Sequence, residues 1–319
     1  MQSDWRPTAS LDTLRKRAAL LSQLRSFFAQ RAVLEVDTPV LMPTTATDLY
    51  IDSFRLDGDT PLYLQTSPEF PLKRLLAAGS GAIYQLGKVF RDEQSSAQHS
   101  REFTMLEWYR PDFTLAQLMD EVELLVLEVL ALYTPSAPRP AFARLSYREI
   151  FQQHLNIDPH RASDQAIAEL VQTRIDLEAT NLSRTDRLQL LLSHCIEPHL
   201  PDACFITDYP AAQAALACIE RDAAGDLVAR RFELFMNGME LANGYLELTD
   251  AAEQRRRFEE DNAKRSAQGK KNLPVDEALL AALEHGLPHC SGVALGVDRL
   301  LMVALGAKTI DEVLSFSLP

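Results

Sequence analysis

Two arginines in separate segments could hold a polyphosphate between them. Arg91 stands in the run FRDE at 90–93, and Arg299 ends the run GVDR at 296–299. A guanidinium group is planar, always charged and rich in donors, which suits it to bind phosphate oxygens. It would also stabilise the charge on a leaving pyrophosphate. The two segments therefore indicate a nucleoside triphosphate held from two sides.

Two glutamates indicate that this site also binds a metal ion. Glu233 and Glu240 stand on paired or continuous predicted strands, and Mg²⁺ binds few carboxylates together with the phosphate oxygens of a nucleotide. Gly292 and Gly296 would let a strand approach the nucleotide closely, because glycine has no side chain. Each charged residue taken alone is more simply explained as ordinary surface charge. The interpretation therefore rests on their combination.

Hydrophobic periodicity and turn residues predict the elements that position these side chains. Helices are expected over 11–31, 66–79, 114–133, 250–270 and 276–285, and a helical insertion over about 145–200. Strands are expected over 33–41 with a break at Pro39, then over 62–65, 82–91, 103–110, 204–209, 227–236 and 240–248, before a final strand-to-helix turn at 291–299. Because strands often follow one another without a helix between them, we expect an α+β fold, with an antiparallel sheet flanked by helices.

Composition limits the class of protein. The 319 residues are 46% hydrophobic and carry a formal net charge of −13. Extended nucleic-acid binding is disfavoured, because it needs a basic surface. No stretch approaches the roughly 20 apolar residues of a membrane helix, and the first residues lack the apolar core of a secretory signal. Four cysteines without CxxC spacing suit a reducing compartment, so we expect a cytoplasmic protein without membrane contact.

Taken together, these segments resemble the signature motifs of class II aminoacyl-tRNA synthetases, and specifically the lysyl-tRNA synthetase branch. The first motif is the long helix that leads into a strand with Pro39. The second is FRDE at 90–93 with His99 and the run EFTM at 102–105, and the third is GVDR at 296–299. The branch is indicated by SPE at 67–69 and ELANGYLEL at 240–248. The resemblance implies the class II catalytic fold in a single domain over 1–319.

The resemblance also implies a role for individual residues. Arg91 and Arg299 would be catalytic, and Glu233 and Glu240 would bind Mg²⁺. ATP would be bound by Arg91, Asp92, Glu93, His99, Ser100, Phe103, Glu240, Leu241, Gly296 and Arg299, with adenine stacked between Phe103 and Arg299. The amino acid would be bound by Ser67, Pro68, Glu69, Glu107, Tyr109, Asn243, Tyr245, Glu247 and Ala294. Several acids in one pocket suit a substrate with two ammonium groups, since each buried cation needs a partner.

Three departures from the lysyl-tRNA synthetase pattern narrow this expectation. The second-motif loop reads HSREF at 99–103 in place of HNPEF, and Ala294 stands where the pattern has glycine beside the amino-acid pocket. The sequence also has only some ten residues before its first predicted helix, where such synthetases carry an anticodon-binding domain. We therefore expect no recognition of a tRNA anticodon.

The chain is most similar in these respects to freestanding paralogues of lysyl-tRNA synthetase that attach (R)-β-lysine to elongation factor P. That resemblance implies ATP and (R)-β-lysine as substrates, elongation factor P as acceptor, and a homodimer built on the first motif. A stand-alone ligase that makes a small-molecule amide or a diadenosine polyphosphate is the alternative. A non-catalytic, amino-acid-binding regulator is less favoured, because Arg91, Glu240 and Arg299 are all present.

Overall fold

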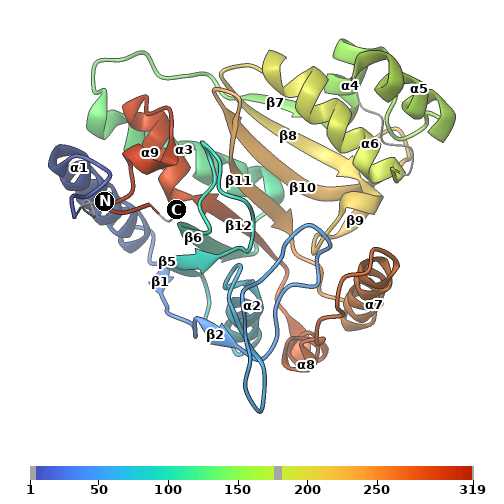
Figure 1. Ribbon diagram of the computed structural model, residues 1–319, viewed down its shortest axis with the longest axis horizontal. Coiled ribbons are helices and arrows are strands. Elements are labelled where there is room, and N and C mark those ends of the chain that lie inside the picture. Colours follow the sequence, from blue (N-terminus) through green and yellow to red (C-terminus); the bar gives the residue numbers. More distant parts are fainter. Residues whose placement is uncertain (1–4, 176–181, 318–319) are drawn as a thin grey trace. The chain divides into compact units, whose positions relative to one another are not determined.

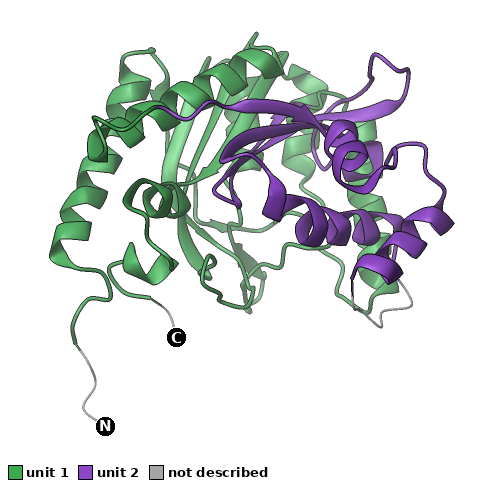
Figure 2. Cartoon of the chain, turned by 90° about the horizontal axis from the view of Figure 1, so that it is seen from above, with its two compact units in different colours: residues 1–138, 248–319 green, residues 139–247 purple. Residues whose placement is uncertain are grey.

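The computed structural model describes residues 5–175 and 182–317. The chain forms two compact units: unit 1 comprises Met1–Pro138 and Leu248–Pro319, and unit 2 comprises Arg139–Glu247 (Figure 2). Each unit combines helices with β-strands, so the predicted α+β class is confirmed. Across the described residues, none of the helices combines the length and the apolar character that crossing a membrane would require.

Four strands of the nine-stranded main sheet lie at the centre of unit 1. They run in the order β1 (Leu34–Glu35), β5 (Ile83–Phe90), β6 (Glu102–Pro111) and β12 (Cys290–Gly296). The last three pair antiparallel, as predicted, whereas β1 joins β5 in parallel. The helices α1 (Leu11–Ala29), α3 (Leu115–Tyr133) and α9 (Val297–Leu305) pack together and against this sheet (Figure 1).

The other elements of unit 1 are shorter. A second sheet has the order β2 (Leu41–Met42), β4 (Leu62–Leu64) and β3 (Arg55–Leu56). The helices α2 (Glu69–Ala77) and α7 (Ala251–Ala267) each pack against α8 (Glu277–Gly286), and the short helix η4 (Ile310–Glu312) follows α9. The strand expected over 33–41 consists of two short pieces, β1 and β2. Pro39 lies between them, and proline cannot donate the hydrogen bond that a continuous ladder needs.

Unit 2 contains the remaining strands. Its order is β11 (Met239–Leu246), β10 (Leu227–Met236), β8 (Ala203–Pro210) and β7 (Ala143–Ser146), and β9 (Ile219–Arg221) also pairs with β10. Only β7 and β8 pair in parallel among these described strands. Asn237 and Gly238 form the turn between β10 and β11, and both have positive φ, which a tight hairpin turn favours.

Helices cover one side of this second group of strands. They are α4 (Tyr147–Leu155), α5 (Asp164–Arg174) and α6 (Arg184–Leu191), followed by η1 (Leu192–Ile196), η2 (Glu197–His199) and, after β8, η3 (Ala211–Gln213). All of these helices except η3 fall within the range of about 145–200 where a helical insertion was predicted, and residues 176–181 of that range lie outside the described part. Their apolar side chains form one core with β8 and β10, which includes Tyr147, Ile150, Phe151, Ile167, Val171, Leu188, Leu191, Cys204, Ile206 and Phe235.

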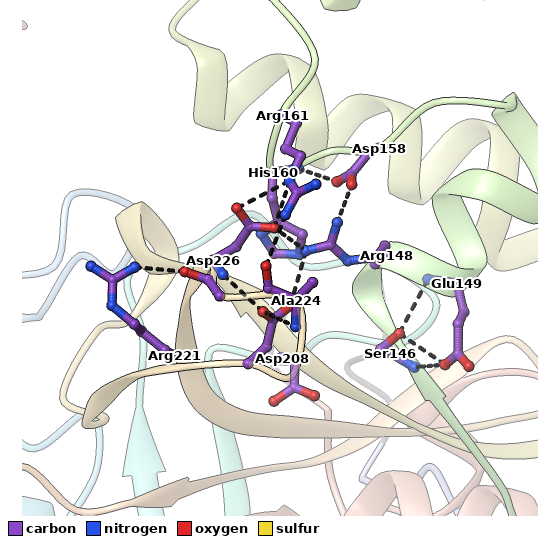
Figure 3. A network of polar contacts seen from close by, with 12 residues as sticks. Ser146, Arg148, Glu149, Asp158, His160, Arg161, Asp208, Arg221, Ala224 and Asp226 are labelled. Carbon is purple, nitrogen blue, oxygen red and sulfur yellow. Dashed lines mark hydrogen bonds and ion pairs between the residues drawn. The ribbon is translucent and has the colours of Figure 1, made fainter.

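An ionic network ties α4 to the turn between β9 and β10 (Figure 3). The guanidinium of Arg148 pairs with Asp158, with Asp222 at 2.9 Å and with Asp226. Its hydrogen bond holds the pKa of Asp226 below the usual value. Nearby, the Nε2 atom of His160 is buried and has no hydrogen-bond partner among the described residues. Burial, and then the charge of Arg148, lower the pKa of His160 below its usual 6.5.

This lowered pKa predicts an acid-sensitive stability. Below pH 6.5 the unfolded chain binds a proton at His160 that the folded chain does not, so the contribution of His160 to the free energy of unfolding should fall as the pH is lowered. The paired aspartates act in a separate window, below about pH 3.8. Urea unfolding at pH 7 and pH 5.5 measures the effect, and His160→Gln should reduce it. The exposed His285 supplies the control: a His285→Gln variant that reduces it equally would contradict the assignment.

Candidate active site

The side chains of β6 point alternately to the two faces of the sheet. We call the face that packs against α1 the core face and the opposite one the site face. On the core face, Trp108 packs against Phe28 of α1 with ring centres 5.4 Å apart. The other face carries Phe103, Met105, Glu107 and Tyr109. Opposite three of these positions, β12 places only small residues, in the register Gly296↔Met105, Ala294↔Glu107 and Gly292↔Tyr109. The small residues leave room beside an acidic group.

Glu107 is the buried acid of this face. It is 2% exposed, and its carboxylate accepts hydrogen bonds from Ser67 Oγ at 2.7 Å and from Tyr109 Oη at 2.8 Å. Three predicted amino-acid-binding residues therefore meet here. Ala294 pairs with Glu107 across the two strands, so its methyl group lies on the same face as the carboxylate. The site face combines a negative charge with a closely placed methyl group.

The start of α2 contributes a second acid. Pro68 is its N-cap residue, and Ser67 Oγ accepts a hydrogen bond from the backbone N–H of Glu69 at 3.0 Å. The Glu69 carboxylate forms an ion pair of 2.6 Å with Lys73, whose side chain is almost completely buried. Because a buried ammonium needs a partner, this pair fixes the rotamer of Glu69. Sequence reasoning predicted Glu69 and missed Lys73.

Arg91 begins the loop between β5 and β6. Its guanidinium carbon lies 5.2 Å from the ring centre of Phe103, and its Nε atom is buried without a hydrogen-bond partner in the described part of the chain. Such a donor is suited to an anionic ligand oxygen, because an unpaired buried donor is costly. The next residue, Asp92, pairs with Arg101 at the far end of the loop. Glu93 and Ser100 are half-buried within the loop.

The same loop contacts the residue that ends the third motif. Arg299, in the first turn of α9, donates through Nε to the carbonyl of Gln98 at 3.2 Å, and its Nη2 lies 2.7 Å from Nε2 of His99. The structure therefore joins two of the predicted ATP-binding residues directly. Gly296 is the N-cap residue of α9. Phe103 faces Arg91 in this structure, and the stacking of adenine between Phe103 and Arg299 stays a prediction.

In unit 2, a β-bulge decides which residues share a face. The hairpin register is Phe235↔Glu240 and then Leu234↔Ala242, so Leu241 is the extra residue of β11. Beyond the bulge, Glu233 pairs with Asn243 and Arg231 with Tyr245. Directly opposed residues point to the same face. The predicted residues Glu233, Glu240, Asn243 and Tyr245 are therefore on one face, and alternation adds Glu247.

Glu233 is the most strongly held of these residues. It pairs with Arg231 and accepts a hydrogen bond of 2.6 Å from Tyr209 Oη. The Arg231 guanidinium in turn lies 4.6 Å from the ring centre of Tyr209 and 5.6 Å from that of Tyr245. Burial raises the pKa of Glu233 to about 7; the charge of Arg231 opposes this and the charge of Glu240 adds to it.

The two predicted metal ligands fit a divalent cation. Glu233 and Glu240 share a face, and the charge of Glu240 raises the pKa of Glu233, a repulsion that a bound cation would relieve. No cluster of three or more His, Cys, Asp or Glu side chains in the described ranges has the arrangement of a metal site. Mg²⁺ held here would therefore depend on phosphate oxygens for further ligands, as is usual in nucleotide sites.

Other residues of this face were only partly predictable. Asn243 donates to Glu233 at 3.4 Å, and its Oδ1 atom is buried without a hydrogen-bond partner among the described residues. Glu247 is 2% exposed and pairs with Ala217 in an isolated bridge. Arg231 and Tyr209 were missed. The signal for Arg231 was present, because a residue two positions from Glu233 on a strand lies on the same face. Tyr209 gave no local signal.

The chain belongs to the class II tRNA synthetases of the D, K and N group, whose family model matches residues 3–318. Within that family it is similar to the elongation factor P–(R)-β-lysine ligase of Edwardsiella ictaluri. The two are 48% identical over 99% of this chain and 98% of the relative. The ligases of the same name from Proteus mirabilis and Hamiltonella defensa are 48% and 44% identical, each over 98% of this chain and 97% of the relative. The predicted family is confirmed.

Proposed function

We propose that this chain activates (R)-β-lysine with ATP and transfers it to a lysine side chain of elongation factor P. The observation that carries the proposal is its similarity, over nearly its whole length, to ligases with that name. The site face of unit 1 supports a cationic substrate, because it buries the Glu107 carboxylate between two hydroxyl donors. The Nε atom of Arg91, which is buried and has no hydrogen-bond partner among the residues that the structure describes, supports an anionic substrate.

In the first step, a carboxylate oxygen of β-lysine attacks the α-phosphorus of ATP. A new bond forms between that oxygen and phosphorus, and the bond to the bridging oxygen of pyrophosphate breaks. Arg91 would stabilise the charge on the α-phosphate and the reacting carboxylate, and Arg299 that on the γ-phosphate. Glu107 and Glu247 would hold the ammonium groups of the substrate, and Glu69 would line the same pocket. The products are an acyl adenylate and pyrophosphate.

In the second step, the amine of the acceptor lysine attacks the acyl carbon of the adenylate. A C–N bond forms, the bond between the acyl carbon and the phosphate oxygen breaks so that AMP leaves, and the amine releases a proton to solvent. Both steps proceed by direct displacement, so no covalent enzyme nucleophile is required. Mg²⁺ bound by Glu233 and Glu240 would neutralise phosphate charge and help to orient the triphosphate.

Several wider features belong to the same proposal. The whole chain, residues 1–319, would act as one catalytic domain, with the helical region at about 145–200 as an insertion in it. Glu93, His99, Ser100 and Leu241 would help to bind the nucleotide. Because the acceptor is an elongation factor, the reaction would take place in the cytoplasm and would need no anticodon-binding domain.

The two arginines provide the direct test of nucleotide activation. Arg91→Ala and Arg299→Ala should each lower ATP–pyrophosphate exchange by orders of magnitude with the fold intact, since a transition-state charge contact contributes ~3–4 kcal/mol. The exposed Arg15 on α1 gives the control, because Arg15→Ala should exchange normally. Near-normal exchange in either folded site variant would disprove the assignment.

Selectivity between lysine isomers should depend on one methyl group. Ala294 lies opposite Glu107 on the site face, where it would crowd the α-ammonium of α-lysine more than the β-ammonium of β-lysine. Ala294→Gly should raise kcat/KM for α-lysine by roughly tenfold, the scale of one methylene in a pocket. The KM for ATP should stay constant as the internal control. An unchanged ratio of kcat/KM for the two isomers would place selectivity elsewhere.

A two-fold homodimer built on the first motif is also part of the proposal. Large apolar side chains are exposed around α1, β1 and β2, where Leu34 is 56% and Leu41 is 42% exposed. A two-fold interface on the first motif would cover these side chains with the same surface of the partner. Light scattering should give twice the chain mass, and Leu34→Asp should give a monomer. Leu227 in unit 2 is 51% exposed, so Leu227→Asp is a matched control; a monomeric wild-type protein that is active would contradict the dimer.

A further inference from the structure

Arg17 reaches from α1 into the part of unit 1 where the second and third motifs meet. Its Nη1 forms an ion pair of 2.6 Å with Asp298 Oδ1, and its Nη2 donates to Thr104 Oγ1 at 2.7 Å. The second oxygen of Asp298 accepts a hydrogen bond of 2.6 Å from the backbone N–H of Thr104. The three residues form a closed network from α1, β6 and α9.

The network is buried, and its charges are matched. The side chain of Asp298 is 2% exposed and that of Arg17 is 12% exposed. A carboxylate in such surroundings needs a partner, because an isolated buried charge is strongly disfavoured. A guanidinium has donors in a fixed fork, so one arginine can hold Asp298 and Thr104 at a set separation. A lysine ammonium lacks this fork.

Arg17 also donates to the carbonyl of Val313 at 3.4 Å, but the two side chains that it holds belong to chain neighbours of proposed adenine-binding residues. Thr104 follows Phe103 on β6, and Asp298 precedes Arg299 in the first turn of α9. Neighbouring residues of a strand point to opposite faces, so fixing Thr104 on the core face also fixes Phe103 on the site face. Fixing Asp298 likewise fixes the position on α9 from which the side chain of Arg299 projects. Arg17 itself lies on the core side and belongs to none of the predicted sites.

We propose that Arg17 is a positioning residue that sets the separation between Phe103 and Arg299 and thereby the affinity for the adenine ring. The inference rests on the proposed function for the identity of the nucleotide. Displacement of a binding group by about 1 Å can weaken function by up to ~100-fold, even when the altered residue is remote from the ligand. Arg17 therefore acts on ATP binding through Thr104 and Asp298.

The test separates positioning from a purely structural role. Arg17→Lys keeps the charge beside Asp298 but loses the fork. The double variant Arg17→Met/Asp298→Asn removes both charges, so no buried carboxylate is left unpaired, and asparagine retains an oxygen that can accept from the Thr104 N–H. Lys16→Met is the matched control, because Lys16 is its exposed neighbour on α1 and pairs only with Asp12 among the described salt bridges.

Calorimetry would measure the Kd for ATP without amino acid, and pyrophosphate exchange would give KM for ATP and for β-lysine separately. We expect ATP to bind roughly ten- to a hundredfold more weakly to the double variant, and to an intermediate degree to Arg17→Lys. The KM for β-lysine should change less than twofold, and Lys16→Met should match the wild type. An unchanged Kd for ATP in both Arg17 variants, together with a lowered Tm, would overturn the inference.

Failure of the proposed function would look different. A wild-type protein that binds ATP but shows no exchange with β-lysine would contradict the proposed substrate. The calorimetric comparison of ATP binding would still decide the role of Arg17, because it involves no amino acid.

Discussion

Both faces of β6 are buried: one packs against the helices of unit 1, and the other carries the acid of the candidate site. Its core face places Trp108 against α1 and Thr104 beside Arg17, whereas its site face places Glu107 between two hydroxyl donors. The arrangement is possible because β12 has small residues on the site face and larger ones, such as Val293 and Leu295, on the core face. The helices that stabilise unit 1 and the residues that would bind substrate therefore depend on the register of the same pair of strands.

Compensation of buried charge recurs in both units. Glu69 forms an ion pair with Lys73, and Asp298 forms one with Arg17. Glu233 forms an ion pair with Arg231 and accepts a hydrogen bond from Tyr209. Buried ion pairs add little net stability relative to apolar packing, but removal of one member is strongly destabilising. Their value in this protein is therefore geometric, since each pair fixes a carboxylate, or the backbone beside it, in one orientation. A binding site made of fixed charges needs little reorganisation when a ligand arrives.

The sequence predicted the elements well and the long-range contacts poorly. Alternation and turn residues located β5, β6 and β10 to within a residue or two, and Pro39 marked the interruption between β1 and β2. Glu107 was identified by a family motif and not by hydrophobic alternation, because the sequence pattern alone cannot show that a single acid in a strand is buried. Arg17 was not predicted. It lies 281 positions from Asp298, and no local periodicity can indicate that two such residues meet.

The bulge at Leu241 gives the hairpin of unit 2 a fixed length. In a regular hairpin from the same turn, Glu233 would face Ala242, and Asn243, Tyr245 and Glu247 would all point to the opposite side. Loss or gain of one residue in β11 would exchange the two sides of everything beyond it. It would also move Gly244 away from the ring of Phe232, which occupies the space where a Cβ atom would lie, 2.4 Å from the nearest ring carbon. This segment can therefore accept substitutions, but an insertion or deletion of one residue would turn every later side chain of β11 to the wrong face.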